Sequence, residues 1–235
     1  MKLSIIMPMY NAEDIVTNLK EATKVLNRVT SDYEIILVDD GSTNDCYKKA
    51  KEFEHEKIRV FRYAKNQGKG YAIKYCFNFV KGEYVAFVDS GRDLNPEQLK
   101  DFMKIMEKEQ ADIVTGSKRH PLSEVHYPLM RKFMSFSYQT INKILFNLSI
   151  KDTQVGLKLF KRGVLEKIMP RIAIKRFAFD LELLVLANKF KFKIVEEPIV
   201  MRYRFKSTIK AASVFWILWD TAAIFYRLKI LRYYD

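Results

Sequence analysis

Residues 84–97 have the sequence YVAFVDSGRDLNPE. The apolar run from 85 to 88 ends directly at Asp89, and a second carboxylate follows at Asp93 before Asn-Pro-Glu opens a helical pattern. A short apolar run bounded in this way is typical of a buried strand. Because open α/β sheets bind ligands outside the carboxyl ends of their strands, the two acids are candidates for a metal or ligand site. The alternative is an ordinary turn, since Asp, Gly and Asn are common turn residues.

The segments before and after this stretch alternate in the same way between strand and helix. We expect strands at residues 3–9, 33–38, 57–63, 84–88 and 111–115, separated by helices near 12–26, 44–53, 70–80 and 96–108. Strands that alternate with helices of this length form βαβ units, so the sequence predicts an α/β fold with a doubly wound, mostly parallel sheet. The loop after the first strand is PMYNAE and lacks G-x-G-x-x-G, which argues against a dinucleotide-dependent oxidoreductase.

The second half of the chain changes character at residue 116. A loop with the sequence SKRHP leads to an amphipathic helix at 130–148. A short strand at 157–160, a helix that begins at 179 and a strand at 192–201 follow.

A final helix is expected from residue 209 to the end of the sequence. Its stretch from 211 to 226 is nearly all apolar, but it is shorter than the roughly 20 residues that span a bilayer and it includes Asp220. A helix that lies at the membrane interface, with Trp216 and Trp219 at the level of the headgroups, fits this pattern better. The alternative is a helix that packs on the domain or on a second copy of the chain.

The net charge indicates which kind of partner the protein binds, and the cysteine content indicates the cellular compartment. The 235 residues include 41 Lys and Arg against 28 Asp and Glu, and the resulting formal charge of +13 favours an anionic partner. No nucleic-acid-binding motif is visible, so no nucleic acid is expected, and a phosphorylated substrate or an acidic membrane surface remains. Cys46 and Cys76 are expected to be packing residues in a reducing compartment. The opening MKLSIIMPMYN has too short an apolar run for a signal peptide, so we expect a peripheral protein on the cytoplasmic face of a membrane.

Four sequence motifs, taken in their order along the chain, resemble those of a known family. SIIMPMYNAE, EIILVDDGSTND, KNQGKGYAI and YVAFVDSGRDLNPE together resemble a family 2 glycosyltransferase of the nucleotide-sugar-binding A type. In the second half, GSKR, DTQVGLKLF, FAFDLELL and FKSTIK resemble the polyprenyl-phosphate glycosyltransferases, that is, the dolichyl-phosphate mannose and dolichyl-phosphate glucose synthases. DTQVGLKLF and FDLELL are closer to the glucosyl branch.

The resemblance implies a division of the chain and an activity. It implies a nucleotide-sugar-binding half at 1–115, an acceptor-binding half of the same catalytic domain at 116–206 and an amphipathic membrane-interface helix at 207–235. The implied reaction is the inverting transfer of a hexose, glucose or mannose, from a UDP or GDP sugar to polyprenyl phosphate with Mg²⁺ or Mn²⁺. A membrane-protein partner remains open.

The resemblance also implies three sets of site residues. The donor is expected to contact Pro8, Tyr10, Glu13, Asp39, Asp40, Arg202, Arg204 and Lys206. The divalent cation is expected on Asp89 and Asp93, and the lipid phosphate on Lys118, Arg131 and Ser135. One position departs from the family pattern, because Gly91 stands where the second acid of D-x-D is usual. Our hypothesis is that Asp93 supplies the missing carboxylate.

These residue types suit the implied chemistry. A sugar diphosphate leaves more easily when a divalent cation and Arg or Lys stabilise its developing charge. The acceptor phosphate has a second pKa of about 6 and is already a dianionic nucleophile near pH 7, so it needs no general base.

Several alternatives stay open at this point. Asp39 and Asp40 could cap the next helix, and Asp180 and Glu182 could form either a solvated helix start or a pair that orients a lysine or sugar hydroxyls. The function could also be transfer to a glycan acceptor, with Asp180 as the base, or non-catalytic binding of a nucleotide sugar.

Overall fold

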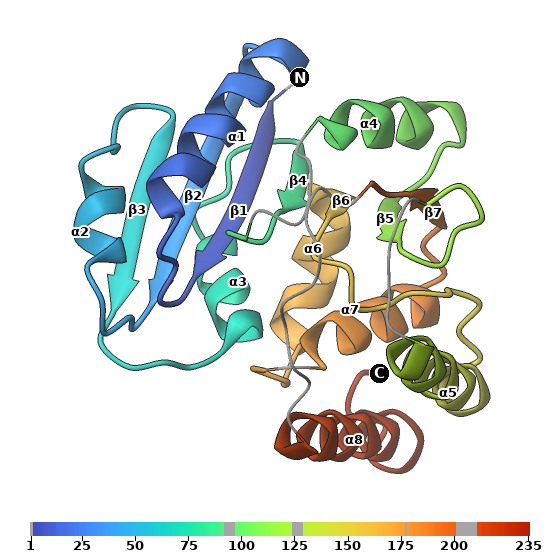
Figure 1. Ribbon diagram of the computed structural model, residues 1–235. Coiled ribbons are helices and arrows are strands. Elements are labelled where there is room, and N and C mark those ends of the chain that lie inside the picture. Colours follow the sequence, from blue (N-terminus) through green and yellow to red (C-terminus); the bar gives the residue numbers. More distant parts are fainter. Residues whose placement is uncertain (1, 92–96, 124–128, 177, 201–210) are drawn as a thin grey trace.

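The computed structural model describes residues 2–91, 97–123, 129–176, 178–200 and 211–235, without the side chains of 129–133 and 211–213 (Figure 1). Its centre is a seven-stranded sheet in the order β3-β2-β1-β4-β6-β5-β7. The strands are β1 Leu3–Met9, β2 Tyr33–Asp40, β3 Ile58–Tyr63, β4 Tyr84–Phe87, β5 Ile113–Ser117, β6 Lys158–Lys161 and β7 Ile194–Pro198. Only β6 runs against its neighbours in this set, antiparallel to both β4 and β5. The prediction of a mostly parallel α/β sheet is confirmed.

Helices cover both faces of this sheet. They are α1 Ile15–Val29, α2 Cys46–Lys51, α3 Lys69–Phe77, α4 Gln98–Lys108, α5 Leu129–Phe146, α6 Arg162–Ile168, α7 Phe179–Lys189 and α8 Ala211–Phe225. A 3₁₀ turn, η1 Met169–Arg171, follows α6, and a π-helical turn, η2 Tyr226–Ile230, follows α8. We did not predict α6 and η1, because seven and three residues are too few to display a helical period.

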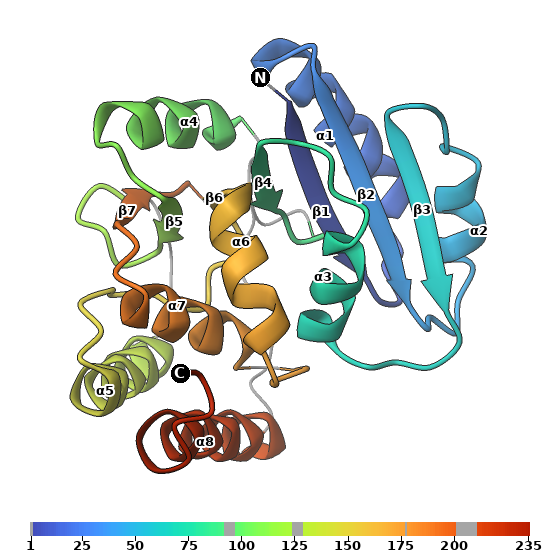
Figure 2. The ribbon, with the colours of Figure 1, turned by 180° about the vertical axis from the view of Figure 1, so that it is seen from behind.

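The core has two layers, one on each face of the sheet. Successive strand residues point to opposite faces, so Ile5 packs with α1, α2 and α4, whereas Ile6 packs with α3, α6 and α7. Figures 1 and 2 show these two groups of helices from opposite sides of the sheet. Both cysteines are free and buried, Cys46 in the first layer and Cys76 in the second, as predicted.

Helix α7 is buried along nearly its whole length. Every residue from Phe179 to Ala187 is buried, including Asp180 and Glu182. The prediction that these two acids could form a solvated helix start is therefore wrong. A helix surrounded by protein has no polar face, so its acids need partners inside the fold.

Glu182 finds its partners in the segment just before α7 and in the segment after η2. Its carboxylate accepts hydrogen bonds from the backbone N–H groups of Ala173 and Ile174, the latter at 2.7 Å. The hydroxyl of Tyr234, whose side chain is fully buried, donates to the same carboxylate. We expected the last helix to reach the end of the sequence; instead α8 gives way to η2, and the chain turns back so that Tyr234 reaches α7.

Helix α8 packs on α5, and both views show these two helices side by side at one end of the molecule (Figures 1 and 2). The Tyr138 hydroxyl lies 3.0 Å from Thr221 Oγ1, and the rings of Phe146 and Phe225 meet edge to face at 6.4 Å. Among the residues that the structure describes, none of the helices is both long and apolar enough to cross a bilayer.

The bond between Tyr234 and Glu182 leads to a stability prediction. Tyr234→Phe removes a buried hydrogen bond to a carboxylate, so urea unfolding should show a free energy of unfolding lower by about 1.5–3 kcal/mol. Tyr233→Phe is the matched control, because this neighbouring ring is 56% exposed, and its change should stay within about 0.5 kcal/mol. Equal effects of the two variants would contradict the assignment.

Candidate active site

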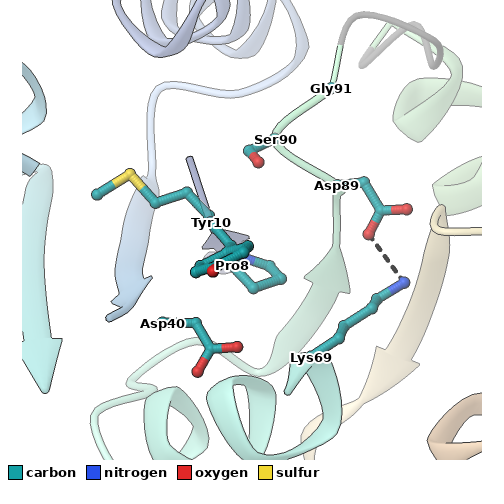
Figure 3. Close-up of a pocket in the computed structure, with 8 residues that line it drawn as sticks. Pro8, Tyr10, Asp40, Lys69, Asp89, Ser90 and Gly91 are labelled. Carbon is teal, nitrogen blue, oxygen red and sulfur yellow. Dashed lines mark ion pairs between the residues drawn. The ribbon is translucent and has the colours of Figure 1, made fainter. Parts of the chain in front are cut away.

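A pocket of about 230 Å³ lies at the carboxyl ends of β1, β2 and β4. These strands are parallel neighbours, so the residues that follow them meet at one edge of the sheet. Figure 3 shows the pocket, whose lining consists of Pro8, Met9, Tyr10, Asp40, Lys69, Asp89, Ser90 and Gly91. Four of the residues named from the sequence line it, namely Pro8, Tyr10, Asp40 and Asp89. Lys69, at the first position of α3, was not among them.

Asp89 follows β4 by two residues, and its carboxylate lies at the wall of the pocket. Its side chain is 44% exposed. On its inner side it lies against the backbone of Gly156, and a Cβ atom at that position would overlap both Oδ2 and Cγ of Asp89. The glycine of DTQVGLKLF is therefore required by close approach to this carboxylate.

Asp89 belongs to a run of alternating charges that we call the ion-pair chain: Asp89, Lys69, Asp180 and Lys158. The ammonium of Lys69 lies 2.8 Å from Asp89 Oδ1 and 3.4 Å from Asp180 Oδ2. The ammonium of Lys158 lies 2.6 Å from Asp180 Oδ1 and also donates to the carbonyl of Val155. These ion pairs thus join α3, α7 and β6 next to the pocket.

The pKa values along the ion-pair chain follow from burial and pairing. Burial alone would lower the pKa of Lys69, but the carboxylates of Asp180 and Asp89 outweigh burial and raise it. Lys158 is fully buried, and here burial dominates and lowers its pKa despite the pairing with Asp180. Burial would raise the pKa of Asp180, yet the ammonium groups of Lys158 and Lys69 hold it below its ordinary value. An acid held ionised by two cations is a weak proton acceptor and a strong organiser of those cations.

Asp40 holds the loop that precedes α3. It accepts hydrogen bonds from the Tyr63 hydroxyl at 2.7 Å and from the backbone N–H groups of Gln67 at 2.6 Å and Gly68 at 2.9 Å. Gly68 has φ +99°, a conformation that favours glycine, so the loop before α3 requires a glycine at this position. Burial, together with the hydrogen bond to Asp40, raises the pKa of Tyr63.

Asp39 is fully buried and does not line the pocket. Its Oδ2 lies 3.1 Å from Arg62 Nε, and its Oδ1 accepts the backbone N–H of Ser42 at 3.1 Å. β2 continues through both acids, whereas we predicted its end at Val38. Because side chains alternate along a strand, one acid faces the pocket edge and the other faces away.

The loop after β1 is fastened to the loop after β2. Asn11 donates its backbone N–H to Ser42 Oγ at 2.8 Å and accepts the backbone N–H of Thr43 on its Oδ1 at 2.9 Å. Glu13 is exposed and does not line the pocket. These bonds fix the positions of Pro8 and Tyr10 at the pocket wall.

The residues predicted for the acceptor lie around a second junction. Lys118 donates its backbone N–H to Asp152 Oδ2 at 3.1 Å, and its ammonium lies 3.8 Å from the same atom. Arg119 lies over the ring of Phe136 and donates to the carbonyl of Ser135 at 3.4 Å. The structure therefore brings the GSKR loop together with α5 at Ser135 and with the start of DTQVGLKLF.

Five predicted site residues cannot be placed. The side chain of Arg131 lies outside the described part of α5, and Asp93, Arg202, Arg204 and Lys206 lie outside the described residues.

The residues around Asp89 fit a divalent cation. Mg²⁺ prefers oxygen ligands and is commonly bound through one or two carboxylates together with substrate phosphates and waters. A half-exposed carboxylate at the wall of an open pocket supplies one such ligand and leaves room for the others.

Sequence reasoning missed Lys69, Lys158 and Gly156 as members of the site. One signal was available, because Lys158 interrupts the apolar run from 155 to 160, and a buried lysine needs an acidic partner. The acids of FDLELL were the candidates.

The fold is also found in solved structures of A-type glycosyltransferases. Glucosyl-3-phosphoglycerate synthase from Mycobacterium tuberculosis superposes with a TM-score of 0.72 at 16% identity, over 96% of this chain and 77% of that one. Mannosyl-3-phosphoglycerate synthase from Rubrobacter xylanophilus gives 0.74 at 16% identity, over 99% and 75%. At such identities the likeness defines the fold alone.

Sequence similarity identifies the family as well as the fold. The chain belongs to glycosyl transferase family 2, whose model matches residues 4–169. It is 32% identical to the dolichyl-phosphate beta-glucosyltransferase of Saccharomyces cerevisiae over 84% of this chain and 66% of that protein. The proteins of the same name from Dictyostelium discoideum and Homo sapiens are 32% and 30% identical, each over 83% of this chain and 64% and 65% of their own lengths. The chain thus spans slightly less than two thirds of these relatives.

Asp180 provides the stability test of the site. Asp180→Asn leaves the buried ammonium of Lys158 without its counter-charge, so urea unfolding should show a loss of about 3–5 kcal/mol. Asp101→Asn is the control, because it breaks a pair with Lys104 whose side chains are 64% and 66% exposed; it should cost at most about 1 kcal/mol. A loss as small as that of the control would mean that Asp180 does not hold Lys158.

Proposed function

We propose that the protein is an inverting glucosyltransferase that moves glucose from UDP-glucose to dolichyl or another polyprenyl phosphate. The observation that carries the proposal is the half-exposed Asp89 carboxylate, held beside Lys69 at the wall of a pocket in a family 2 fold. The choice of sugar and lipid is supported by the relatives named dolichyl-phosphate beta-glucosyltransferase. The choice of UDP over GDP is supported by the fold neighbour crystallised with UDP and Mn²⁺.

In this proposal the donor occupies the pocket between β1, β2 and β4. Tyr10 is 50% exposed at the wall and offers a ring face to the base. Pro8 and Asp40 line the same wall, whereas Asp39 and Glu13, which we also assign to the donor, do not line it. Bound Mg²⁺ or Mn²⁺ would stabilise charge on the departing diphosphate. Asp89 and Asp93 would hold that ion, and Arg202, Arg204 and Lys206 would close on the diphosphate.

The acceptor phosphate is proposed to lie at Lys118, Arg131 and Ser135. Lys118 and Ser135 belong to segments that Arg119 links directly. Asp152 keeps Lys118 in place, so its ammonium is positioned before a ligand arrives. A dianionic phosphate can attack the anomeric carbon directly, and one displacement inverts the configuration. A glycan acceptor would need a base. Asp180 is poorly suited to that role, because an ammonium group is paired with each of its oxygens and the two together lower its pKa, which makes it a weak proton acceptor.

The lipid requires access to a membrane, and we propose that α5 and α8 provide it. The large exposed apolar side chains of these helices include Phe136, Ile144, Phe215, Trp216, Leu218 and Trp219. Exposed basic residues follow at Lys229 and Arg232, where they can meet lipid phosphates. Arg227, which we also expected there, has a buried guanidinium nitrogen and lies near Glu182 and Tyr234 instead. The proposed location is peripheral, at the cytoplasmic face. The proposed division remains 1–115 for the donor, 116–206 for the acceptor and 207–235 for the interface, with a membrane-protein partner as an additional proposal.

A direct assay tests this function. Purified protein is incubated with Mn²⁺, dolichyl phosphate in detergent and labelled UDP-glucose, GDP-mannose or UDP-N-acetylglucosamine, and lipid-linked sugar is extracted. We expect a glucosyl lipid from UDP-glucose that is lost when EDTA removes the metal. Transfer to soluble glycans that survives Arg131→Ala would favour a glycan acceptor. Nucleotide binding that ignores Mn²⁺, without turnover, would favour a non-catalytic binding protein.

Gly156 gives a sharper prediction with a matched control. In Gly156→Ala the new methyl group must displace the Asp89 carboxylate. A misplacement of about 1 Å can cost roughly 100-fold in rate, so kcat/KM for UDP-glucose should fall by about that factor. Gly163→Ala is the control, because no atom lies within 4 Å of its added methyl group. The control should retain wild-type activity, and a Gly156→Ala enzyme of normal activity would contradict the role of Asp89.

The membrane interface gives a separate prediction. Trp216 and Trp219 are 48% and 62% exposed on α8, so replacing both by Ser should leave the fold intact and weaken binding to anionic vesicles by about tenfold or more. Cosedimentation measures the binding, and activity on a short water-soluble isoprenyl phosphate should be preserved as the control. Unchanged cosedimentation would contradict the interface.

A further inference from the structure

Lys69 occupies an unusual place for a lysine in a donor pocket. Its ammonium lies between two carboxylates, 2.8 Å from Asp89 and 3.4 Å from Asp180. The side chain is 31% exposed, and Figure 3 shows it reaching from the start of α3 toward Asp89 across the pocket wall. The acid that would bind a divalent cation is therefore already paired with a cation in the ligand-free protein.

The two lysines of the ion-pair chain differ in their freedom to move. Lys158 is fully buried and is held by both Asp180 and the carbonyl of Val155. It fixes one oxygen of Asp180 and leaves the other facing Lys69. Lys69 can therefore give up Asp89 without losing all of its counter-charge, because Asp180 stays where it is.

Charge balance shows when such an exchange is favourable. The ion-pair chain contains two carboxylates and two ammonium groups, so its formal charge is zero. A divalent cation that binds alone adds two positive charges next to the ammonium of Lys69, and the repulsion between them opposes binding. A cation that arrives with a diphosphate brings its own negative charge, and the ammonium then has a new anion within reach.

We propose that Lys69 is the built-in counter-ion of Asp89, and that a divalent cation displaces it only when a nucleotide diphosphate binds at the same time. Lys69 then remains with Asp180 and turns toward the diphosphate. The pocket would thus reject free metal ions and accept metal and donor as one unit. This inference deepens the proposed function and rests on its use of a nucleoside diphosphate donor with a divalent cation.

The test measures Mn²⁺ binding in the absence of turnover. Electron paramagnetic resonance of free Mn²⁺ gives the dissociation constant of the full chain with and without UDP. For the wild type we expect UDP to tighten Mn²⁺ binding by about tenfold or more, a magnitude ordinary for coupled sites. By reciprocity, Mn²⁺ tightens UDP binding by the same factor.

Two substitutions of Lys69 separate charge from packing. Lys69→Met keeps the length of the side chain and removes the charge, so Mn²⁺ should bind about tenfold more tightly than to the wild type without UDP, and the coupling should shrink accordingly. Lys69→Arg keeps the charge and should resemble the wild type. Lys65→Met, an exposed lysine of the same loop, controls for the general loss of one positive charge and should leave Mn²⁺ affinity unchanged.

Different results contradict the inference and the proposed function. Equal Mn²⁺ affinities of Lys69→Met and wild type without UDP would overturn the inference, as would a wild type in which UDP does not tighten Mn²⁺ binding. The second criterion uses the wild type alone and holds even if a variant fails to fold. The measurement contains neither sugar nor lipid. Tight Mn²⁺ binding by Lys69→Met together with a wild type that forms no lipid-linked sugar would contradict the proposed acceptor and not the inference. A wild type that forms lipid-linked sugar, while Lys69→Met binds Mn²⁺ no more tightly than the wild type, would contradict the inference alone.

Discussion

The arrangement of the site depends on the ion pairs that the carboxylate of Asp180 forms with two lysines. This carboxylate joins α7 to β6 through Lys158 and to α3 through Lys69, and α3 begins at the pocket. Burying three charged groups costs several kcal/mol for each ion, and only mutual pairing with good geometry offsets that cost. A buried network of this kind therefore tolerates few alternative arrangements. It positions the ammonium of Lys69 next to Asp89 before any ligand is present.

The same helix connects the pocket with the far end of the molecule. Two residues after Asp180, Glu182 accepts bonds from Ala173, Ile174 and Tyr234. The adjoining carbonyl of Lys175 accepts the backbone N–H of Tyr71 in α3 at 3.1 Å. The residues that end the chain and the helix that carries Lys69 are thus fastened to one short segment. Because α8 leads directly into that end of the chain, the proposed membrane-facing helix and the proposed donor pocket share a rigid support.

The sequence predicted the sheet and the main helices well, since most of them are long, periodic and separated by clear turn signals. It also predicted four residues of the pocket wall, because the carboxyl ends of parallel strands must meet at one edge. It did not reveal the antiparallel direction of β6, since the residue pattern of a four-residue strand does not show which way the strand runs. Nor did it identify the partners of Asp180, because pairing among buried charges depends on which elements meet in space. Lys69 and Lys158 are 89 positions apart in the sequence, so no local pattern links them.

The contact between Gly156 and Asp89 limits how the site can vary. Aspartate is the shorter of the two acidic residues and glycine is the smallest residue of all, so position 89 cannot carry a shorter acid and position 156 cannot carry a smaller residue. A longer acid at position 89 cannot be accommodated by trimming position 156, and a side chain at 156 cannot be accommodated by a shorter acid. In many packed pairs a larger residue at one position is offset by a smaller residue at the other. These two positions cannot compensate for each other in that way. The segment after β4 and the segment before β6 are thus in direct contact beside the pocket, with no room for a side chain between the Asp89 carboxylate and the backbone of residue 156.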